Sequence, residues 1–275
     1  MHFHFPLNTV QVLWTLTFAG LLVLLVVLLG RDRARRFPWF MTSIVLTALR
    51  LLTSRLLYGR MAPITLSAIS IMLTDVTAVV ALLVVVEMAR RAFVSAPRRA
   101  WIVSTVVMVA VSAGIVIVWG PWPAWKTVAE VSVLGALRFM QLVAQKGNSF
   151  ADLLTIELGL LVAFFGRRYK AGWRSHTQRL VIGLAVAAIS QIAVEVVWRE
   201  LTMYARPRSL ADYQHIIGMQ EKLLNANSTV YLVVLVWWIA CLWKDEPGMP
   251  VNGEDVVALP PAAADPPAPA KATDH

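Results

Sequence analysis

Seven long apolar stretches are the feature that most constrains what this chain can fold into. A helix needs roughly 20 mostly apolar residues to cross the hydrocarbon core of a bilayer. Backbone groups in lipid must be paired within the segment, so each stretch is predicted to be a helix. We therefore predict an all-α, polytopic membrane protein, a bundle of seven transmembrane helices over residues 9–29, 39–58, 64–88, 101–119, 149–166, 180–202 and 223–243.

Basic side chains are spread unevenly over the loops between these segments. The loops after the first, third and fifth segments hold thirteen basic residues, whereas the other three loops, which are longer in total, hold seven. The thirteen are Arg31, Arg33, Arg35, Arg36, Arg90, Arg91, Arg98, Arg99, Arg167, Arg168, Lys170, Arg174 and Arg179. Because loops rich in Lys and Arg remain in the cytoplasm, we expect the N-terminus outside and the C-terminus in the cytoplasm.

The formal net charge of +9 does not by itself indicate a nucleic-acid partner. Most of this charge lies in loops at one membrane face, where orientation and anionic lipid headgroups account for it. The expected partners are the lipid bilayer and a separate membrane or cytoplasmic protein, with no nucleic acid. Arginine is far more frequent than lysine and the C-terminal stretch is rich in Ala and Pro, which favours a GC-rich bacterium. We therefore expect a multi-pass protein of a bacterial inner membrane.

The chain divides into a seven-helix transmembrane domain, residues 1–244, and a tail, residues 245–275. The tail is rich in Pro, Ala and acidic residues and has too little apolar surface to fold, so it is predicted to be a disordered cytoplasmic segment. A receptor with its own kinase or cyclase would need an output domain at this place. We expect a signal from this protein to leave through a separate protein instead.

Two stretches on the outer side are predicted to form amphipathic helices. Residues 124–146 place polar side chains on one side of a helical wheel and apolar side chains on the other. Residues 209–224 begin with a capping-box-like sequence and continue at helical spacing, and Asn225-Ala-Asn227 is the expected turn into the last segment. The two helices would either cover the outer mouth of the bundle or anchor it at the membrane interface.

Three ionisable residues at similar depth form the main candidate site. Arg50, Asp75 and Glu157 lie near the midplane of three different segments, where a charge is costly and normally faces the interior of the bundle. A short loop joins the segments that carry Arg50 and Asp75, so we expect these two to form a pair. Two interpretations remain open: a structural pair with Glu157 hydrogen-bonded to Thr155 or Gln191, or a ligand pocket or proton pathway.

The outer face offers weaker candidates. Tyr213 and His215 lie on the predicted outer helix, and His215 with Asp212 and two N-terminal histidines could form a metal site, although their spacing is not diagnostic. The remaining ionisable residues within the segments have ordinary structural explanations, among them Asp152 as a helix cap and Glu195 paired with Arg199. No metal and no cofactor is expected.

Enzyme motifs are missing from the sequence. It has no H-E-x-x-H, no G-x-S-x-G and no phosphate-binding G-x-x-x-x-G-K-[ST]. The predicted topology resembles that of rhodopsins and seven-helix receptors, but the residues differ. The last segment has no interior lysine for a retinal Schiff base, because Lys244 lies at its edge. The third segment ends Glu87-Met-Ala-Arg90-Arg91, which differs from the Asp/Glu-Arg-Tyr triplet of seven-helix receptors.

Two functions follow from these observations. The first is a non-enzymatic sensing or accessory subunit that binds a ligand, a lipid or a partner protein through the outer half of the bundle. The alternative is a small transporter or channel that uses Arg50, Asp75 and Glu157. A sensor should have a pocket on one side only, whereas a transporter should have a water-accessible path through the midplane. A membrane enzyme would need a nucleophile, a metal or an acid–base pair in such a pocket.

Overall fold

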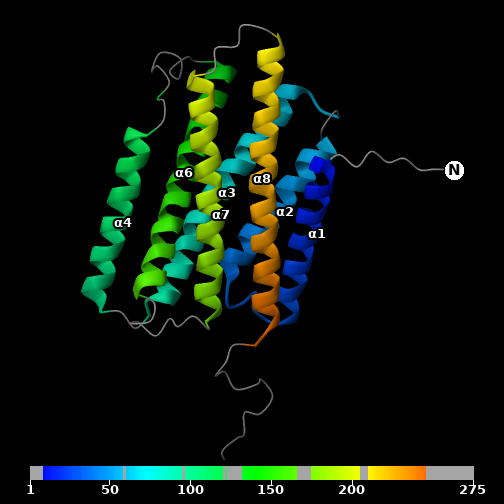
Figure 1. The fold of residues 1–275 in the computed structure, drawn as a ribbon. Coiled ribbons are helices and arrows are strands. Elements are labelled where there is room, and N and C mark those ends of the chain that lie inside the picture. The colour runs from blue at the N-terminus through cyan, green and yellow to red at the C-terminus, as the bar shows by residue number, and fades with distance from the viewer. Residues whose placement is uncertain are drawn as a thin grey trace, which may run out of the picture.

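The structure, a computed structural model, describes residues 9–57, 60–94, 97–119, 122, 132–165, 175–204 and 210–245. In this part of the chain every regular element is a helix, with no strand (Figure 1). The helices are α1 (Thr9–Gly30), α2 (Pro38–Leu57), α3 (Pro63–Ala92), α4 (Arg98–Val118), α6 (Val133–Phe165), α7 (His176–Tyr204) and α8 (Leu210–Trp243). All seven are long and apolar enough to cross a membrane. The predicted all-α bundle of seven transmembrane helices is confirmed.

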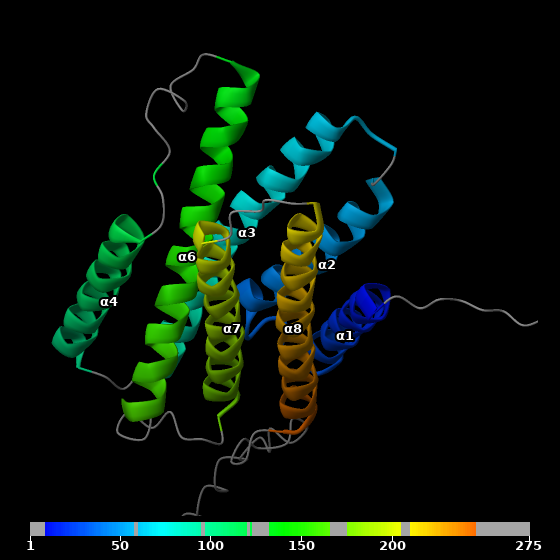
Figure 2. The ribbon, with the colours of Figure 1, turned by 45° about the horizontal axis from the view of Figure 1, so that its top comes forward.

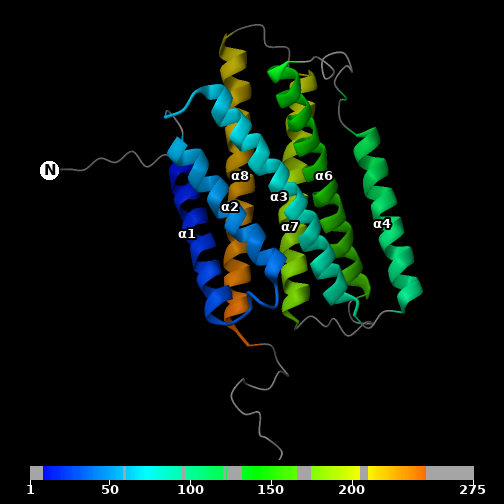
Figure 3. The ribbon, with the colours of Figure 1, turned by 180° about the vertical axis from the view of Figure 1, so that it is seen from behind.

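Six of the helices form a closed ring. Around it each helix contacts the next, in the order α1, α2, α3, α6, α7, α8 and back to α1. Across the ring, α3 approaches α7, and the aromatic ring of Phe40 on α2 meets that of Trp238 on α8. The tilted view in Figure 2 shows the ring helices side by side, and the rear view in Figure 3 shows α2 and α3 crossing the others obliquely. The fourth helix, α4, lies outside the ring and packs against α6, and its Trp101 also contacts Phe93 at the end of α3.

The prediction of which helices face the interior is partly wrong. The fourth segment carries no charge and the first carries none in its core, which predicts that both face lipid. The fourth does so, because α4 carries a continuous exposed apolar surface, including Ile102, Val103 and Val106. In contrast, α1 is part of the ring and buries Leu21 and Leu24 completely. A uniformly apolar helix has no polar side that marks its inner face, so the sequence alone does not reveal this position.

The amphipathic outer helices are not separate elements. Residues 133–146 are the first half of α6, and residues 210–224 are the first part of α8. Residues 124–131 of the first predicted helix lie outside the described part of the chain. The expected turn at Asn225-Ala-Asn227 does not occur, because Asn227 bonds α7 from within a continuous helix.

The apolar core fills one half of the ring. We call the end where α1 and α3 finish and α2 and α4 begin the arginine end, because Arg31–Arg36, Arg90, Arg91, Arg98 and Arg99 lie there. The largest fully buried side chains lie in the half nearest to it: Leu21, Leu24, Leu28, Phe37, Phe40, Met88, Leu158, Leu180, Leu235, Trp238 and Leu242. Close packing therefore closes the ring towards the arginine end.

The end of α8 is attached to this same end of the bundle. Asp245 forms ion pairs with Arg31 at 3.3 Å and Arg33 at 3.4 Å, and Arg33 also donates to the carbonyl oxygen of Lys244 at 2.8 Å. The sequence placed Asp245 in the tail, but this residue docks on the bundle. The remainder of the predicted tail, residues 246–275, lies outside the described residues.

Candidate functional site

A cavity of about 640 Å³ lies at the centre of the ring. Every ring helix contributes to its wall, whereas α4 does not. Its polar lining consists of Thr17, Ser43, Thr47, Arg50, Thr77, Gln145, Asn148, Ser149, Asp152, Thr155, Gln191, Glu195, Gln220, Asn227, Ser228 and Tyr231. Their positions along the helices place most of these residues in the half of the bundle away from the arginine end. The volume is within the range of small-molecule pockets.

The bottom of the cavity is apolar and tightly packed. Phe40, Ile44, Val84 and Trp238 line it, and each is at most 3% exposed. The rings of Phe40 and Trp238 meet edge to face, with centroids 5.1 Å apart. These residues belong to the same core that fills the arginine half. The cavity therefore ends on this layer, and its polar lining extends from there toward the opposite end of the bundle.

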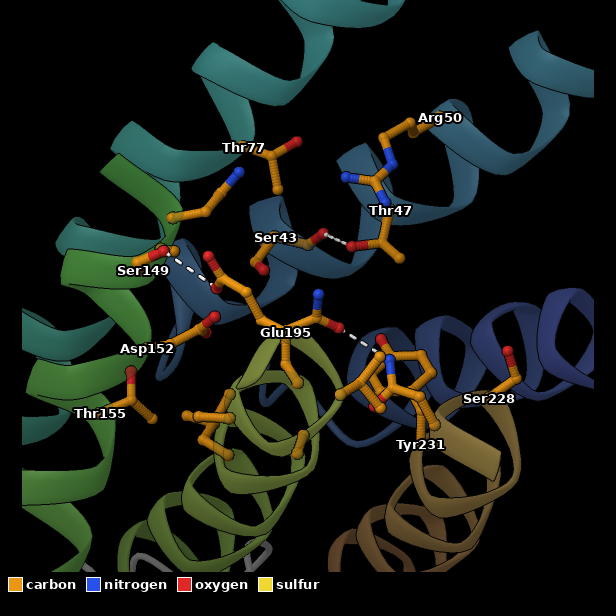
Figure 4. A pocket seen from close by; sticks show the side chains of 18 of the residues that line it. Ser43, Thr47, Arg50, Thr77, Ser149, Asp152, Thr155, Glu195, Ser228 and Tyr231 are labelled. Atoms are coloured by element: carbon orange, nitrogen blue, oxygen red, sulfur yellow. Dashed lines mark hydrogen bonds between the residues drawn. The ribbon is translucent and has the colours of Figure 1, made fainter. Parts of the chain in front are cut away.

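One wall of the cavity is acidic and comes from α6 and α7. The Glu195 carboxylate accepts a hydrogen bond from Ser149 Oγ at 3.2 Å and a longer one from Gln145 Nε2 at 3.5 Å. Asp152 lies one helical turn after Ser149 and is close enough to Glu195 for their charges to interact. Among the described residues Asp152 has no hydrogen-bond or ion-pair partner. Figure 4 shows both carboxylates beside the open space of the pocket.

A lysine near this wall is occupied elsewhere. Lys146 Nζ donates to the carbonyl oxygens of Trp119 at 2.6 Å and Val116 at 3.2 Å, at the end of α4. It also lies 4.7 Å from the ring centre of Trp122. The ammonium of Lys146 therefore joins α4 to α6 and does not line the cavity.

Arg50 stands on the α2 side of the cavity (Figure 4). Its guanidinium is near Tyr231 of α8, and Thr47 lies one turn before Arg50, also beside Tyr231. Arg50 forms no ion pair with any described residue, so its charge is available to the cavity. The predicted candidate Arg50 is thus a cavity residue.

Gln191, the other predicted candidate in the cavity, belongs to a polar network between α7 and α8. Ser190 Oγ donates to Asn227 Oδ1 at 2.8 Å, and Asn227 Nδ2 donates to Gln191 Oε1 at 2.7 Å. The amide of Asn227 thus bonds two neighbouring residues of α7 and fixes the register of the two helices. It also presents a neutral polar wall to the cavity.

The predicted pair of Arg50 and Asp75 is wrong. Asp75 does not line the cavity, and its buried Oδ1 has no partner among the described residues. It lies one turn before Ala78, which packs against Gly147 of α6. Asp75 therefore belongs to the α3 face directed at α6, and Arg50 is directed into the ring.

Glu157 is also separated from the cavity. Its nearest polar neighbour is Ser112 of α4, which is fully buried. Neither the Glu157 carboxyl oxygens nor Ser112 Oγ makes a hydrogen bond within the described part of the chain. The expected bonds to Thr155 or Gln191 are not formed, because Thr155 donates to the carbonyl oxygen of Ala151 at 2.7 Å. The three midplane charges thus lie in three different places.

The outer-face candidates lie near the start of α8. Tyr213 is 55% exposed, and His215 is exposed as well. The histidines expected to join them, His2 and His4, lie outside the described residues. Within the described residues, no group of three or more His, Cys, Asp and Glu side chains is placed to hold a metal ion.

Sequence reasoning missed the two carboxylates of the cavity. Asp152 was interpreted as a cap because the fifth segment was expected to begin at residue 149, but α6 begins at Val133 and Asp152 lies well inside it. Glu195 was paired with Arg199, but it bonds α6 instead. The spacing of Gln145, Ser149 and Asp152 on one helix face was the signal that would have indicated a polar interior wall.

Comparison with known proteins finds no matching family model, no matching curated protein and no matching solved structure. The function of the cavity must therefore be inferred from its own residues.

Proposed function

We propose that this protein is a non-enzymatic membrane protein that binds a ligand in the central cavity and acts as a sensing or accessory subunit. The observation that carries the proposal is the one-sided cavity. It has a polar wall at one end and ends on the packed layer of Phe40, Val84 and Trp238 at the other. A pocket of this shape suits binding from one side of the membrane.

The distribution of arginine supports the direction of access. The polar part of the cavity lies in the half of the bundle away from the arginine end. By the positive-inside rule that end faces the cytoplasm, so the ligand enters from the outside. Ligand binding would be transmitted to a separate protein through the ring helices, each of which reaches from the cavity wall to the arginine end.

The transporter alternative receives less support. Of the three charges on which it was based, Asp75 and Glu157 lie outside the cavity, and the packed layer interrupts any path along the axis of the ring. An enzyme would need a nucleophile, metal or acid–base pair arranged around a reacting atom. Across the cavity Asp152 and Glu195 face Arg50 and hydroxyl groups such as those of Ser43 and Thr47, and within the described part of the chain no hydrogen bond joins these two hydroxyls to either carboxylate.

One-sided access can be tested by cysteine labelling in proteoliposomes. The buried Cys241, 6% exposed, is first replaced in Cys241→Ser. A single cysteine is then introduced in the cavity wall, in Asn148→Cys, or at the arginine end, in Arg98→Cys. An impermeant reagent should label Asn148→Cys from one membrane face only, the face opposite to the one from which it labels Arg98→Cys. This result should be the same with and without added solutes. Ser112→Cys, at a position that is 0% exposed, is the control and should react from neither face.

Binding is tested on the same protein by thermal unfolding with a library of small solutes. The cavity-filling variant Ala188→Trp should lose every stabilisation that a solute gives to the unmodified protein, because Ala188 lines the cavity. The matched variant Val106→Trp, on the exposed face of α4, should keep it. Labelling of Asn148→Cys from both faces, or solute uptake into the proteoliposomes, would contradict a sensor and favour a transporter.

A further inference from the structure

The charges of the cavity stand on opposite walls and are not paired with each other. Arg50 comes from α2, and Asp152 and Glu195 come from α6 and α7 (Figure 4). No ion pair joins Arg50 to either carboxylate, and none joins Arg50 or Asp152 to another residue of the described chain. Charges lining a water-accessible pocket without a protein partner are groups that a ligand can satisfy.

The acidic wall favours a positively charged group. Two carboxylates close enough to interact repel each other, and a cation between them removes that repulsion. Glu195 is held in place by Ser149 and Gln145, whereas Asp152 has no donor among the described residues. The charge of Lys146 is near enough to interact with Glu195, but its ammonium is bound by the carbonyl oxygens at the end of α4 and forms no ion pair with either carboxylate in the described part of the chain.

The basic wall favours a negatively charged group. The guanidinium of Arg50 offers several N–H donors in a plane that matches a carboxylate or a phosphate. Tyr231 and Thr47 stand beside it and add hydroxyl groups to the same wall. A ligand with only positive charge would leave Arg50 unpaired, and a ligand with only negative charge would face Asp152 and Glu195.

We propose that the cavity binds a zwitterionic ligand, with its ammonium group at Asp152 and Glu195 and its carboxylate or phosphate at Arg50. The apolar part of the ligand would lie on Phe40, Ile44 and Trp238 at the bottom of the cavity. This chemistry belongs both to free amino-acid-like solutes and to the headgroup of a zwitterionic phospholipid. The inference rests on the proposed ligand-binding function and names the class of ligand for the same site.

The experiment compares matched compounds on the full-length protein in phosphatidylglycerol nanodiscs. The probes are the standard amino acids and glycerophosphoethanolamine, each with an amine and an acid that lack one of its two charges. At least one zwitterion should raise the melting temperature and bind by calorimetry. Its two singly charged partners should bind about tenfold more weakly or worse, as expected for the loss of one charge-assisted contact.

Two variants test each charged wall separately, by the ratio of zwitterion affinity to the affinity of its singly charged partner. A general loss of stability would not change this ratio. In Arg50→Gln the zwitterion should bind no better than its matched amine. In Asp152→Asn combined with Glu195→Gln, which removes both carboxylates, it should bind no better than its matched acid. Arg55→Gln on α2 and Glu200→Gln on α7 change the same kinds of residue outside the cavity. They should preserve the preference for the zwitterion.

The two sources of zwitterion are separated by the lipid of the nanodisc. If the natural ligand is a free solute, the added zwitterion should bind equally in phosphatidylglycerol and phosphatidylethanolamine nanodiscs. If it is a lipid headgroup, phosphatidylethanolamine should compete for the cavity, and the added zwitterion should be displaced in the second kind of nanodisc. Absence of binding by every zwitterion, or equal binding of a singly charged partner, would overturn the inference. If a singly charged or neutral solute binds from one side instead, this inference fails but the proposed sensing function is retained. The sensing function is contradicted only by access from both sides or by transport.

Discussion

Glu87 connects two helices in the middle of the apolar core. Its side chain is 5% exposed, its Oε1 accepts from Arg91 Nη2 at 3.5 Å, and its Oε2 accepts from the backbone N–H of Phe40 at 3.1 Å. Phe40 lies in the first turn of α2, where N–H groups have no partner within the helix. A carboxylate at this place also faces the positive end of the helix dipole. Glu87 of α3 therefore acts as a cap for α2.

Removing this carboxylate should destabilise the fold strongly. In Glu87→Leu the N–H of Phe40 and the guanidinium of Arg91 both lose their partner, and breaking such a buried pair costs about 3–5 kcal/mol. Since Arg91 is 34% exposed at its side chain and can be hydrated, we expect the lower end of this range. Glu87→Gln keeps an acceptor for Phe40 and should lose less. Denaturant unfolding in detergent measures both; equal stability of Glu87→Leu and the unmodified protein would contradict the cap.

Gly183 provides the space in which the indole of Trp238 is buried. A Cβ atom at position 183 would collide with Nε1 of Trp238 and come within 2.8 Å of its Cε2. Gly183→Ala should therefore lower stability by about 1–3 kcal/mol, as overpacking of a core does. Gly114→Ala on α4 is the control, because nothing lies within 4 Å of that position. The control should be neutral or slightly stabilising in a melting experiment, and a neutral Gly183→Ala would show that Trp238 can move.

The depth of a polar residue in the membrane could be predicted from the sequence, but its direction could not. Arg50, Asp75 and Glu157 were correctly placed inside helices. Which of them point into the ring depends on the rotation of each helix about its own axis, and that rotation is set by packing with its neighbours. Only Arg50 and Gln191 of the predicted midplane candidates line the cavity.

Because Arg50 and Asp75 do not meet, their substitutions should act independently. We expect the stability losses of Arg50→Met and Asp75→Leu to add within about 0.5 kcal/mol in the double variant. Arg50→Met should itself cost little, since its charge has no partner among the described residues. Unfolding free energies of the two single variants and the double variant test this expectation. Partial rescue in the double variant would indicate that the two side chains approach each other after all.

At the scale of elements, a close crossing of α6 and α7 supports the acidic wall. A Cβ atom at Gly159 would lie 2.5 Å from Cβ of Ala185, so the two helices approach each other as closely as small residues permit. Gly159→Ala should force them apart and lower the melting temperature. Gly159→Ala with Ala185→Gly moves the methyl group to the other helix and should recover part of the loss. No recovery would mean that the crossing is not limited by this contact.

The number of helices could be predicted from the sequence, whereas the length of two of them could not. Hydropathy identifies the apolar part of a span. It does not identify polar helical turns continuous with that part, such as the first half of α6 from Val133 and the first turns of α8 from Leu210. In α6 one of these turns bonds the neighbouring helix through Gln145, which donates to Glu195 of α7. Such tertiary partners are unknown when a single segment is considered.

At the scale of the whole molecule, the ring has a packed half and a polar half. The packed half carries the core and lies at the arginine end, and the polar half carries the cavity. Side chains in the packed half resist displacement because the interior is close-packed and the alternatives are cavities or overlaps. This division lets one half hold the helices in register while the other half adjusts to a ligand, which fits a binding protein better than a continuous pore.

The orientation of this asymmetric bundle in the membrane is the prediction on which the direction of ligand entry depends. In a Cys241→Ser background we place one cysteine at each end, Met61→Cys after α2 and Arg98→Cys at the start of α4. Both positions are exposed, Met61 by 42%. Since basic loops remain inside, an impermeant reagent should label Met61→Cys in intact cells and Arg98→Cys only after the membrane is opened. The reverse pattern would place the cavity mouth in the cytoplasm, and the ligand would then have to be sought among cytoplasmic solutes.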